Sequence, residues 1–194
     1  MKKLFIAALM LIGTAGFAQN FQLGVKAGAN FSNFTGGNFE NIKKSTLVGF
    51  HGGGFINFMF GNHLSLQPEV LFSTQGAKLK ESGNEENFKV SYVNVPVMVK
   101  YRFDGGFYLE AGPQIGFKVS EDIPDNSVKD FAKSTDLSVA AGLGFHSNMG
   151  LGIGARYTAG LSKVGDFNAS EIDPDFKNSV IQVSLFYTLF NNNK

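Results

Sequence analysis

The chain has 194 residues and a formal net charge of +1; Gly and Phe are abundant, at 24 and 21 residues, and Cys and Trp are absent. This length is enough to bury the core of one domain. Without Cys there can be no disulfide, thiol nucleophile, thiolate metal site or cysteine-linked lipid anchor. The sequence has no stripe of basic residues, so nucleic-acid binding has little support.

Residues 1–18 are predicted to be a secretory signal peptide. Two lysines precede an apolar segment over residues 4–12, and the small residues Gly16 and Ala18 mark a cleavage site. The apolar segment is shorter than the roughly 20 residues that a membrane-spanning helix needs. We therefore expect an exported domain over residues 19–194, which can enter a membrane only through strands.

Most of the remaining chain alternates apolar and polar side chains. This alternation gives a strand one apolar and one polar face. The pattern is clearest on either side of residues 104–106, Asp-Gly-Gly, a short-turn signal that predicts a hairpin. The expected strands number about eight and cover residues 21–34, 46–60, 64–75, 88–103, 107–119, 136–146, 151–161 and 179–190.

Glycines and prolines complicate some of these strands. The alternation of residues 46–60 is ambiguous, and the three glycines at 52–54 indicate tight curvature or close backbone approach. Pro68, Pro96 and Pro113 have no N–H to donate, so we expect bulges or interrupted pairing at these positions.

The connections between strands alternate in length. The short ones are residues 61–63, 104–106 and 147–150, and the long ones are 35–45, 76–87, 120–135 (with a helical turn around 127–133) and 162–178. Transmembrane barrels have short periplasmic turns and longer outer loops. The sequence therefore predicts an all-β fold, an eight-stranded antiparallel up-and-down transmembrane β-barrel, with lipid outside and a polar lumen.

Several stretches carry a family resemblance: residues 21–34 (FQLGVKAGANFSNF), 64–77 (LSLQPEVLFSTQGA), 92–103 (YVNVPVMVKYRF), 108–117 (YLEAGPQIGF) and the aromatic last strand. They resemble the outer-membrane β-barrel domain family of Bacteroidetes, often labelled porin family or PorT-like. The resemblance implies a small OmpA/OmpX-type barrel, inserted into outer-membrane lipid by the barrel-assembly machinery, with envelope proteins as candidate partners.

The polar faces carry charged and amide side chains that we expect to line the lumen. They are Lys26, Gln67, Glu69, Lys100, Arg102, Glu110, Gln114, Lys118 and Arg156. An unpaired buried charge costs several kcal/mol, and both signs are present here. The simplest interpretation is a paired structural network that fills the lumen; a gated ion path and a small-ligand site are the alternatives.

Other motifs give little support for chemistry. His51, His63 and His146 lack the spacing of a metal site, so we expect neither metal nor cofactor. Ser147 follows His146, but neighbouring strand residues point to opposite sides, which argues against a Ser–His pair.

Glycines and aromatic residues both fit a barrel. The glycines of residues 142–154 lack the strand-to-helix setting of a phosphate loop and are interpreted as small lumen-facing positions. An outward-facing aromatic girdle at the membrane interfaces is expected from Phe31, Phe34, Phe58, Phe60, Tyr101, Phe103, Phe107, Phe145, Tyr157, Phe186, Tyr187 and Phe190.

These features favour a non-enzymatic integral outer-membrane protein with a structural, surface-contact or envelope-machinery role. The alternatives are a small passive or gated channel, an outer-membrane lipid-modifying enzyme, and a soluble periplasmic lipocalin-like barrel. A lipocalin-like barrel would have polar side chains on its exterior and apolar side chains in its lumen, the inverse of the expected pattern.

Overall fold

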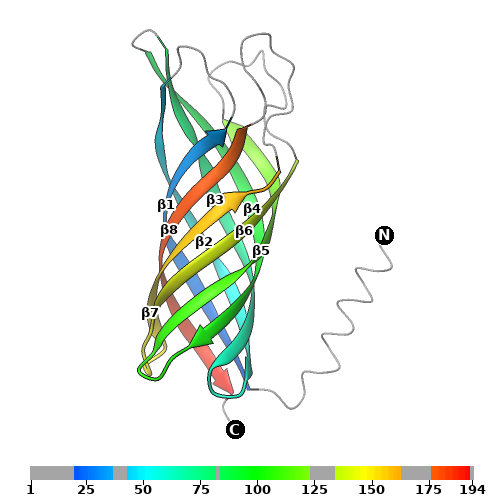
Figure 1. Ribbon diagram of the computed structural model, residues 1–194, viewed down its shortest axis with the longest axis vertical. Helices are drawn as coiled ribbons and strands as arrows, with labels where there is room; N and C mark the ends of the chain where they lie inside the picture. Colours follow the sequence, from blue (N-terminus) through cyan, green and yellow to red (C-terminus); the bar gives the residue numbers. More distant parts are fainter. Residues whose placement is uncertain (1–19, 37–42, 82–83, 123–133, 163–175, 193–194) are drawn as a thin grey trace, which may run out of the picture.

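The computed structural model describes residues 20–36, 43–81, 84–122, 134–162 and 176–192. They form a closed barrel in which each strand pairs with the next and β1 pairs with β8, all antiparallel (Figure 1). The strands are β1 (Phe21–Gly36), β2 (Lys43–Phe60), β3 (Leu64–Glu81), β4 (Asn84–Arg102), β5 (Phe107–Asp122), β6 (Thr135–His146), β7 (Leu151–Gly160) and β8 (Phe176–Asn192). This confirms the predicted eight-stranded up-and-down barrel.

The strands extend further toward the long connections than alternation predicted. The expected charged loop at 76–87 is wrong, because β3 and β4 stay paired up to Glu81 and Asn84. This hairpin rises above its neighbours in Figure 1. Alternation cannot detect such an extension, since a strand pair with water on both faces needs no apolar face. The helical turn expected around 127–133 lies outside the described residues.

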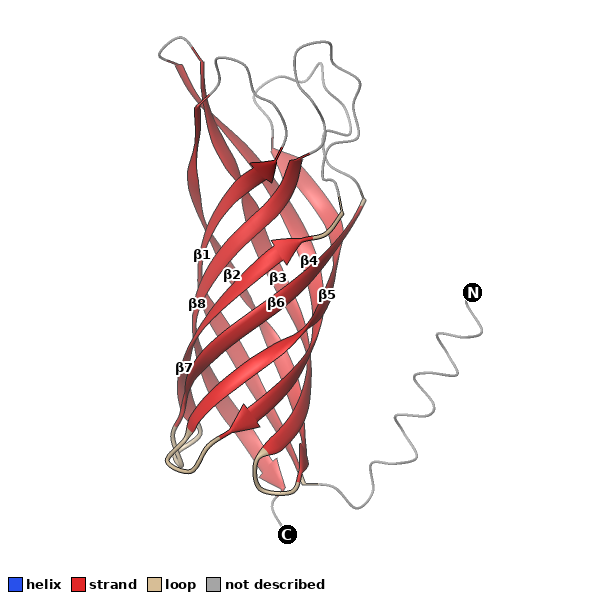
Figure 2. Cartoon of the chain, in the orientation of Figure 1, coloured by secondary structure: helices blue, strands red, loops and turns tan. Residues whose placement is uncertain are grey.

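The short turns lie together at one end of the barrel, where β1 begins and β8 ends (Figure 2). In the β4–β5 turn Gly105 and Gly106 have φ angles of 91° and 94°, which glycine adopts without steric cost. The sequence signal for this hairpin is therefore confirmed. Among the described residues, no helix is long and apolar enough to cross a membrane.

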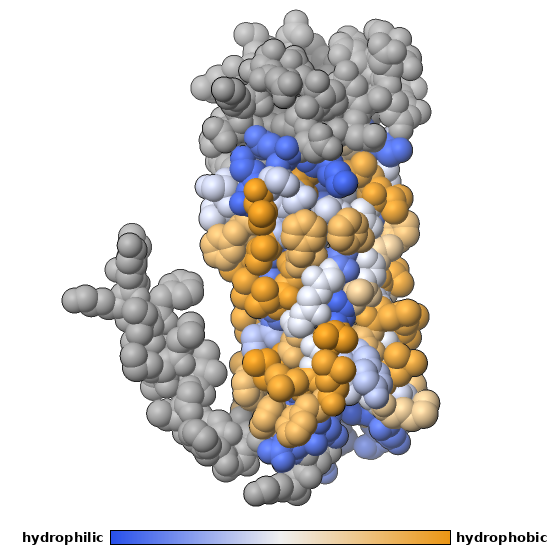
Figure 3. Space-filling model, turned by 180° about the vertical axis from the view of Figure 1, so that it is seen from behind, coloured by the Kyte–Doolittle hydropathy of each residue, from blue (hydrophilic) through white to orange (hydrophobic). Residues whose placement is uncertain are grey.

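Apolar side chains face outward and polar side chains face the lumen. Val99 and Leu109 are 50% and 46% exposed, whereas their neighbours Lys100 and Glu110 are 5% and 6% exposed. Figure 3 shows the result as an apolar belt around the visible face of the barrel, with hydrophilic residues at both ends. This is the opposite of a soluble barrel with an apolar lumen.

Strand β2, ambiguous in the sequence, also has two distinct faces. His51, Phe55 and Asn57 are buried in the lumen. A side chain at Gly53 would overlap the carbonyl oxygen of Val70, so the expected close backbone approach is confirmed.

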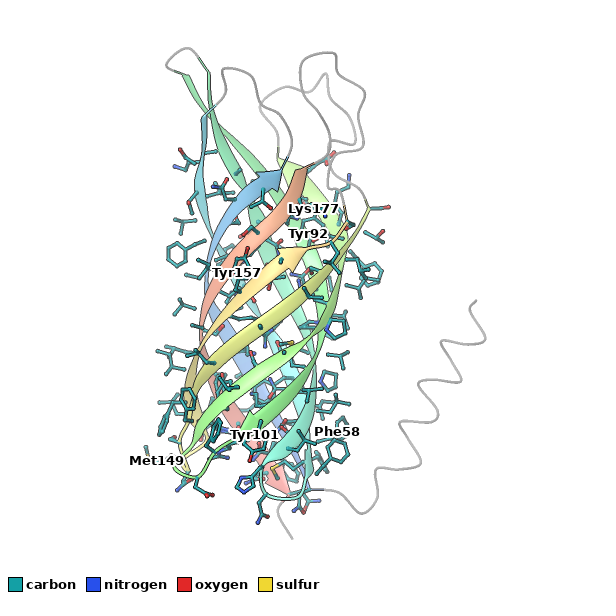
Figure 4. All side chains as sticks on the ribbon, in the orientation of Figure 1. Phe58, Tyr92, Tyr101, Met149, Tyr157 and Lys177 are labelled. Carbon is teal, nitrogen blue, oxygen red and sulfur yellow. The ribbon has the colours of Figure 1, made fainter. Side chains whose placement is uncertain are left out.

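Most of the described aromatic residues of the expected girdle face outward. Figure 4 places Phe58 and Tyr101 near the short turns and Tyr157 nearer the opposite end. The assignment of Phe186 was wrong, because this ring is 4% exposed and packs in the lumen against Phe55, with ring centroids 6.0 Å apart. Its neighbours in β8 face outward, so alternation directs Phe186 inward.

Candidate functional site: the charged lumen

Glu69 of β3 is the centre of a charged cluster inside the barrel. Lys26 Nζ, from β1, donates to Glu69 Oε1 at 2.7 Å. Arg156, from β7, donates to both carboxylate oxygens, Nη1 to Oε2 at 3.0 Å and Nη2 to Oε1 at 2.8 Å. This two-pronged contact is the strong form of an arginine–carboxylate pair.

Arg156 also pairs with the second carboxylate of the cluster, Glu110 of β5. Arg156 Nε donates to Glu110 Oε1 at 2.8 Å. Glu110, Gly142 and Arg156 are register partners on three successive strands. A side chain at Gly142 would crowd the Cα and Cβ of Arg156. The glycine on β6 thus leaves the space across which Arg156 reaches Glu110.

Lys100 of β4 completes the cluster. Its Nζ donates to Gln67 Oε1 at 2.8 Å and lies 3.6 Å from Glu110 Oε2. It also sits 4.1 Å from the centre of the Tyr108 ring, within the range of a cation–π contact. Gln67 Nε2 in turn donates to Glu69 Oε1 at 2.7 Å, so the Gln67 amide connects Lys100 to Glu69.

The cluster closes the lumen with paired charges. None of its members, Lys26, Gln67, Glu69, Lys100, Glu110 and Arg156, is more than 6% exposed. Water is largely kept away from these groups, so each charge depends on its protein partners. An eight-stranded barrel has an interior that side chains can fill, and this one is filled at the level of the cluster.

Three other residues that we expected in the lumen lie away from the cluster. Gln114 lies four residues beyond Glu110 along β5, about 13 Å at the usual rise, and donates to Ser138 Oγ at 3.3 Å. Lys118, further along the same strand, pairs with Glu121 at 3.1 Å. Arg102 lies at the short-turn rim, where Nη2 donates to the backbone oxygen of His146 at 3.0 Å. Strand position thus separates these three residues from the cluster.

A second network, which sequence reasoning did not identify, is centred on Asn30 and His51. Asn30 Nδ2 donates to the backbone oxygens of Phe50 and Thr74, both at 3.0 Å. Its Oδ1 therefore faces His51 Nδ1, 2.7 Å away, and that nitrogen must carry the proton. In the neutral imidazole His51 Nε2 is then an acceptor, and Ser184 Oγ donates to it at 2.8 Å.

The order Ser184–His51–Asn30 is that of a nucleophile, a base and an orienting group. Ser184 and His51 are only 7% and 2% exposed, and Asn30 is fully buried. A substrate carbonyl could not reach Ser184 without displacing neighbouring side chains. The arrangement therefore satisfies buried polar atoms. The pair considered from the sequence, His146 with Ser147, is not formed. His146 Nε2 lies instead 3.1 Å from Thr188 Oγ1.

A polar cavity of about 600 Å³ opens at the short-turn end of the lumen. Its lining includes Arg102, His146 and amides such as Asn62 and Asn148. It is the mouth of the barrel below the cluster. Within the described ranges, no three His, Cys, Asp or Glu side chains come together as a metal site requires.

The signals that could have identified the second network are weak. A lumen-facing Asn, His or Ser has the same strand parity as any other polar residue. Asn30 and Gln182, which share a hydrogen bond of 3.1 Å, lie 152 residues apart. Only barrel closure between β1 and β8 brings them together.

Known proteins similar to this chain include two of solved structure. Among solved structures, the chain is similar to neisserial surface protein A (NspA), with a TM-score of 0.53 and 14% identity, covering 86% of this chain and 97% of that chain. It is also similar to Ail of Yersinia pestis, solved in complex with the heparin analogue sucrose octasulfate, with a TM-score of 0.49 and 18% identity, covering 88% and 99%. No curated protein matches the sequence.

A family match covers most of the chain. Residues 17–166 match the family described as outer membrane protein beta-barrel domain. The family, the closed barrel and its apolar belt all indicate a location in the outer membrane. The chain therefore belongs to the outer membrane protein beta-barrel domain family and resides in the outer membrane.

Proposed function

We propose that this protein is a non-enzymatic and non-conducting outer-membrane barrel, a rigid anchor that serves surface contact or envelope machinery. The observation that carries the proposal is the cluster around Glu69, which joins five strands and closes the lumen with buried, paired charges. Breaking such pairs is costly, so the closed state is stable.

Other parts of the proposal rest on the sequence. The resemblance to Bacteroidetes PorT-like barrels supports an envelope role, and residues 1–18 support export with cleavage after Ala18. The proposed partners are outer-membrane lipid, the barrel-assembly machinery during insertion, and envelope proteins. Amino-terminal sequencing of the membrane-extracted protein tests the cleavage site, because the proposal requires a chain that starts at Gln19.

The burial of Ser184 supports the non-enzymatic part of the proposal. A serine hydrolase reacts with a fluorophosphonate at its nucleophile. We expect no labelling of the folded protein, and labelling that disappears in Ser184→Ala would identify an enzyme instead.

A narrow channel is the second candidate function. It is favoured by buried polar atoms that have no hydrogen-bond partner within the described residues, among them Asn94 Nδ2, Gln114 Oε1 and Thr158 Oγ1. Such atoms are usually satisfied by water, and water in the lumen would favour conduction.

Planar bilayer recording separates the two functions. We expect no unitary conductance from the refolded wild-type protein. Discrete openings that change in size or frequency in Glu69→Gln would reject the non-conducting barrel and support the channel. Openings that Glu69→Gln leaves unchanged would point to a leak outside the lumen, and a heat-modifiability gel then shows whether misfolded protein is present.

A further inference from the structure

A hollow of about 420 Å³ lies on the outer surface of the barrel. We call it the outer groove. Its walls come from five strands and are apolar: Leu23, Ile56, Pro68, Val70, Val95 and Leu189. Gly54 lies at its floor, where the outward position of β2 has no side chain.

The groove coincides with an interruption in strand pairing. The β2–β3 ladder passes from the pair Phe55–Glu69 to the pair Phe58–Leu66. The β3–β4 ladder passes from Pro68–Val97 to Leu71–Asn94. Pro68 lies in the gap of the β2–β3 ladder and Pro96 in the gap of the β3–β4 ladder, and neither proline has an N–H to donate. The missing side chain of Gly54 beside these two gaps leaves a hollow in the outer surface.

The surroundings of the groove determine what can occupy it. Val25 and Val70, the register partners of Gly54, are 47% and 57% exposed. They belong to the apolar belt, which is the interface with lipid. No polar or charged group is stable in this part of the bilayer without an internal partner. Hydrocarbon is the occupant that fits an apolar hollow continuous with that interface.

We propose that the outer groove binds one acyl chain of a membrane phospholipid at a defined position. Leu23 lies near the start of β1 and Leu189 near the end of β8, both toward the short turns. The lipid therefore comes from the leaflet on the short-turn side. This inference is independent of whether the lumen conducts.

Gly54→Leu is the substitution that tests the groove. A Cβ at Gly54 would meet only the backbone oxygen of Gly24, at an ordinary 3.5 Å, so a side chain there fills the groove without disturbing the barrel. Gly52→Leu is the matched control. It lies on the same outward face of β2, a Cβ there has only contacts of 3.8 and 3.9 Å, and it does not line the groove.

The measurement is photo-crosslinking of the full-length protein in nanodiscs that contain phosphatidylethanolamine with a diazirine on one acyl chain. Peptide mass spectrometry should find an excess of cross-links around Leu23, Ile56 and Val70 in the wild type and in Gly52→Leu. Gly54→Leu should lose that excess, with unchanged labelling elsewhere on the belt. A heat-modifiability gel verifies that each variant is folded.

Two results would overturn the proposal. The first is even labelling around the whole belt, or an excess that survives filling of the groove. The second is disulfide cross-linking between two copies of an Ile56→Cys variant, which would make a second copy the occupant. If Gly54→Leu does not fold, Val95→Phe narrows the groove from its opposite wall, and the same two readouts apply.

Discussion

Replacing Glu69 by Gln keeps the shape of the side chain and removes its charge from the middle of the lumen. In the wild type Glu69 is the only ion-pair partner of Lys26 within the described residues, and it shares Arg156 with Glu110. After the change three cations, those of Lys26, Lys100 and Arg156, would face one carboxylate. The new amide nitrogen would also face the donors of Arg156, and two donors cannot bond to each other.

The expected loss follows from the burial of these groups. Removing one partner of a buried ion pair costs about 3–5 kcal/mol, because the remaining charge is left without compensation. Total stabilities are about 5–15 kcal/mol, so Glu69→Gln should remove a large share of the free energy of unfolding. We would measure it by urea titration of the protein folded into lipid vesicles, with the heat-modifiable band as the signal for the folded barrel.

Two further variants make the result specific. Glu121→Gln removes a partly exposed carboxylate that pairs with Lys118 on the same strand, and should cost no more than about 1 kcal/mol. Combining Lys26→Met with Glu69→Gln removes one of the two uncompensated cations and should recover part of the loss. If Glu69→Gln cost no more than Glu121→Gln, the lumen would be hydrated and the argument for a dry, closed barrel would be wrong.

Three other substitutions test separate parts of the structure. Gly142→Leu would crowd Arg156 across the β6–β7 pair, so we expect no folded band on a heat-modifiability gel. Leu185→Arg places a charge on the lipid side near the middle of β8 and should cost about 2–4 kcal/mol in the same urea titration, while a negligible cost would mean that this face does not contact lipid. Ser184→Ala leaves His51 Nε2 without a donor and should cost about 1–3 kcal/mol; full stability would show that water replaces the hydroxyl.

Much of the barrel could be predicted because local rules govern it. Apolar and polar residues alternate along each strand, as Val99 beside Lys100 and Leu109 beside Glu110 show. The Asp-Gly-Gly turn predicts a hairpin because its glycines adopt positive φ. The same rules fail where no apolar face is needed, so they predict a loop where β3 and β4 extend to Glu81 and Asn84.

Alternation along the sequence divides the side chains of most strands into an apolar and a polar face, and the loop lengths, the leader and the family resemblance indicate that the polar face lines the lumen. The same pattern does not predict which lumen side chains contact one another. Glu69 and Arg156 lie 87 residues apart, and their contact depends on how far each strand is shifted when the sheet closes. Closure sets the height of every lumen residue at once, so Gln114 and Lys118 lie away from the cluster although they share its parity. These heights had to come from the closed barrel, since period-two alternation contains no information on height.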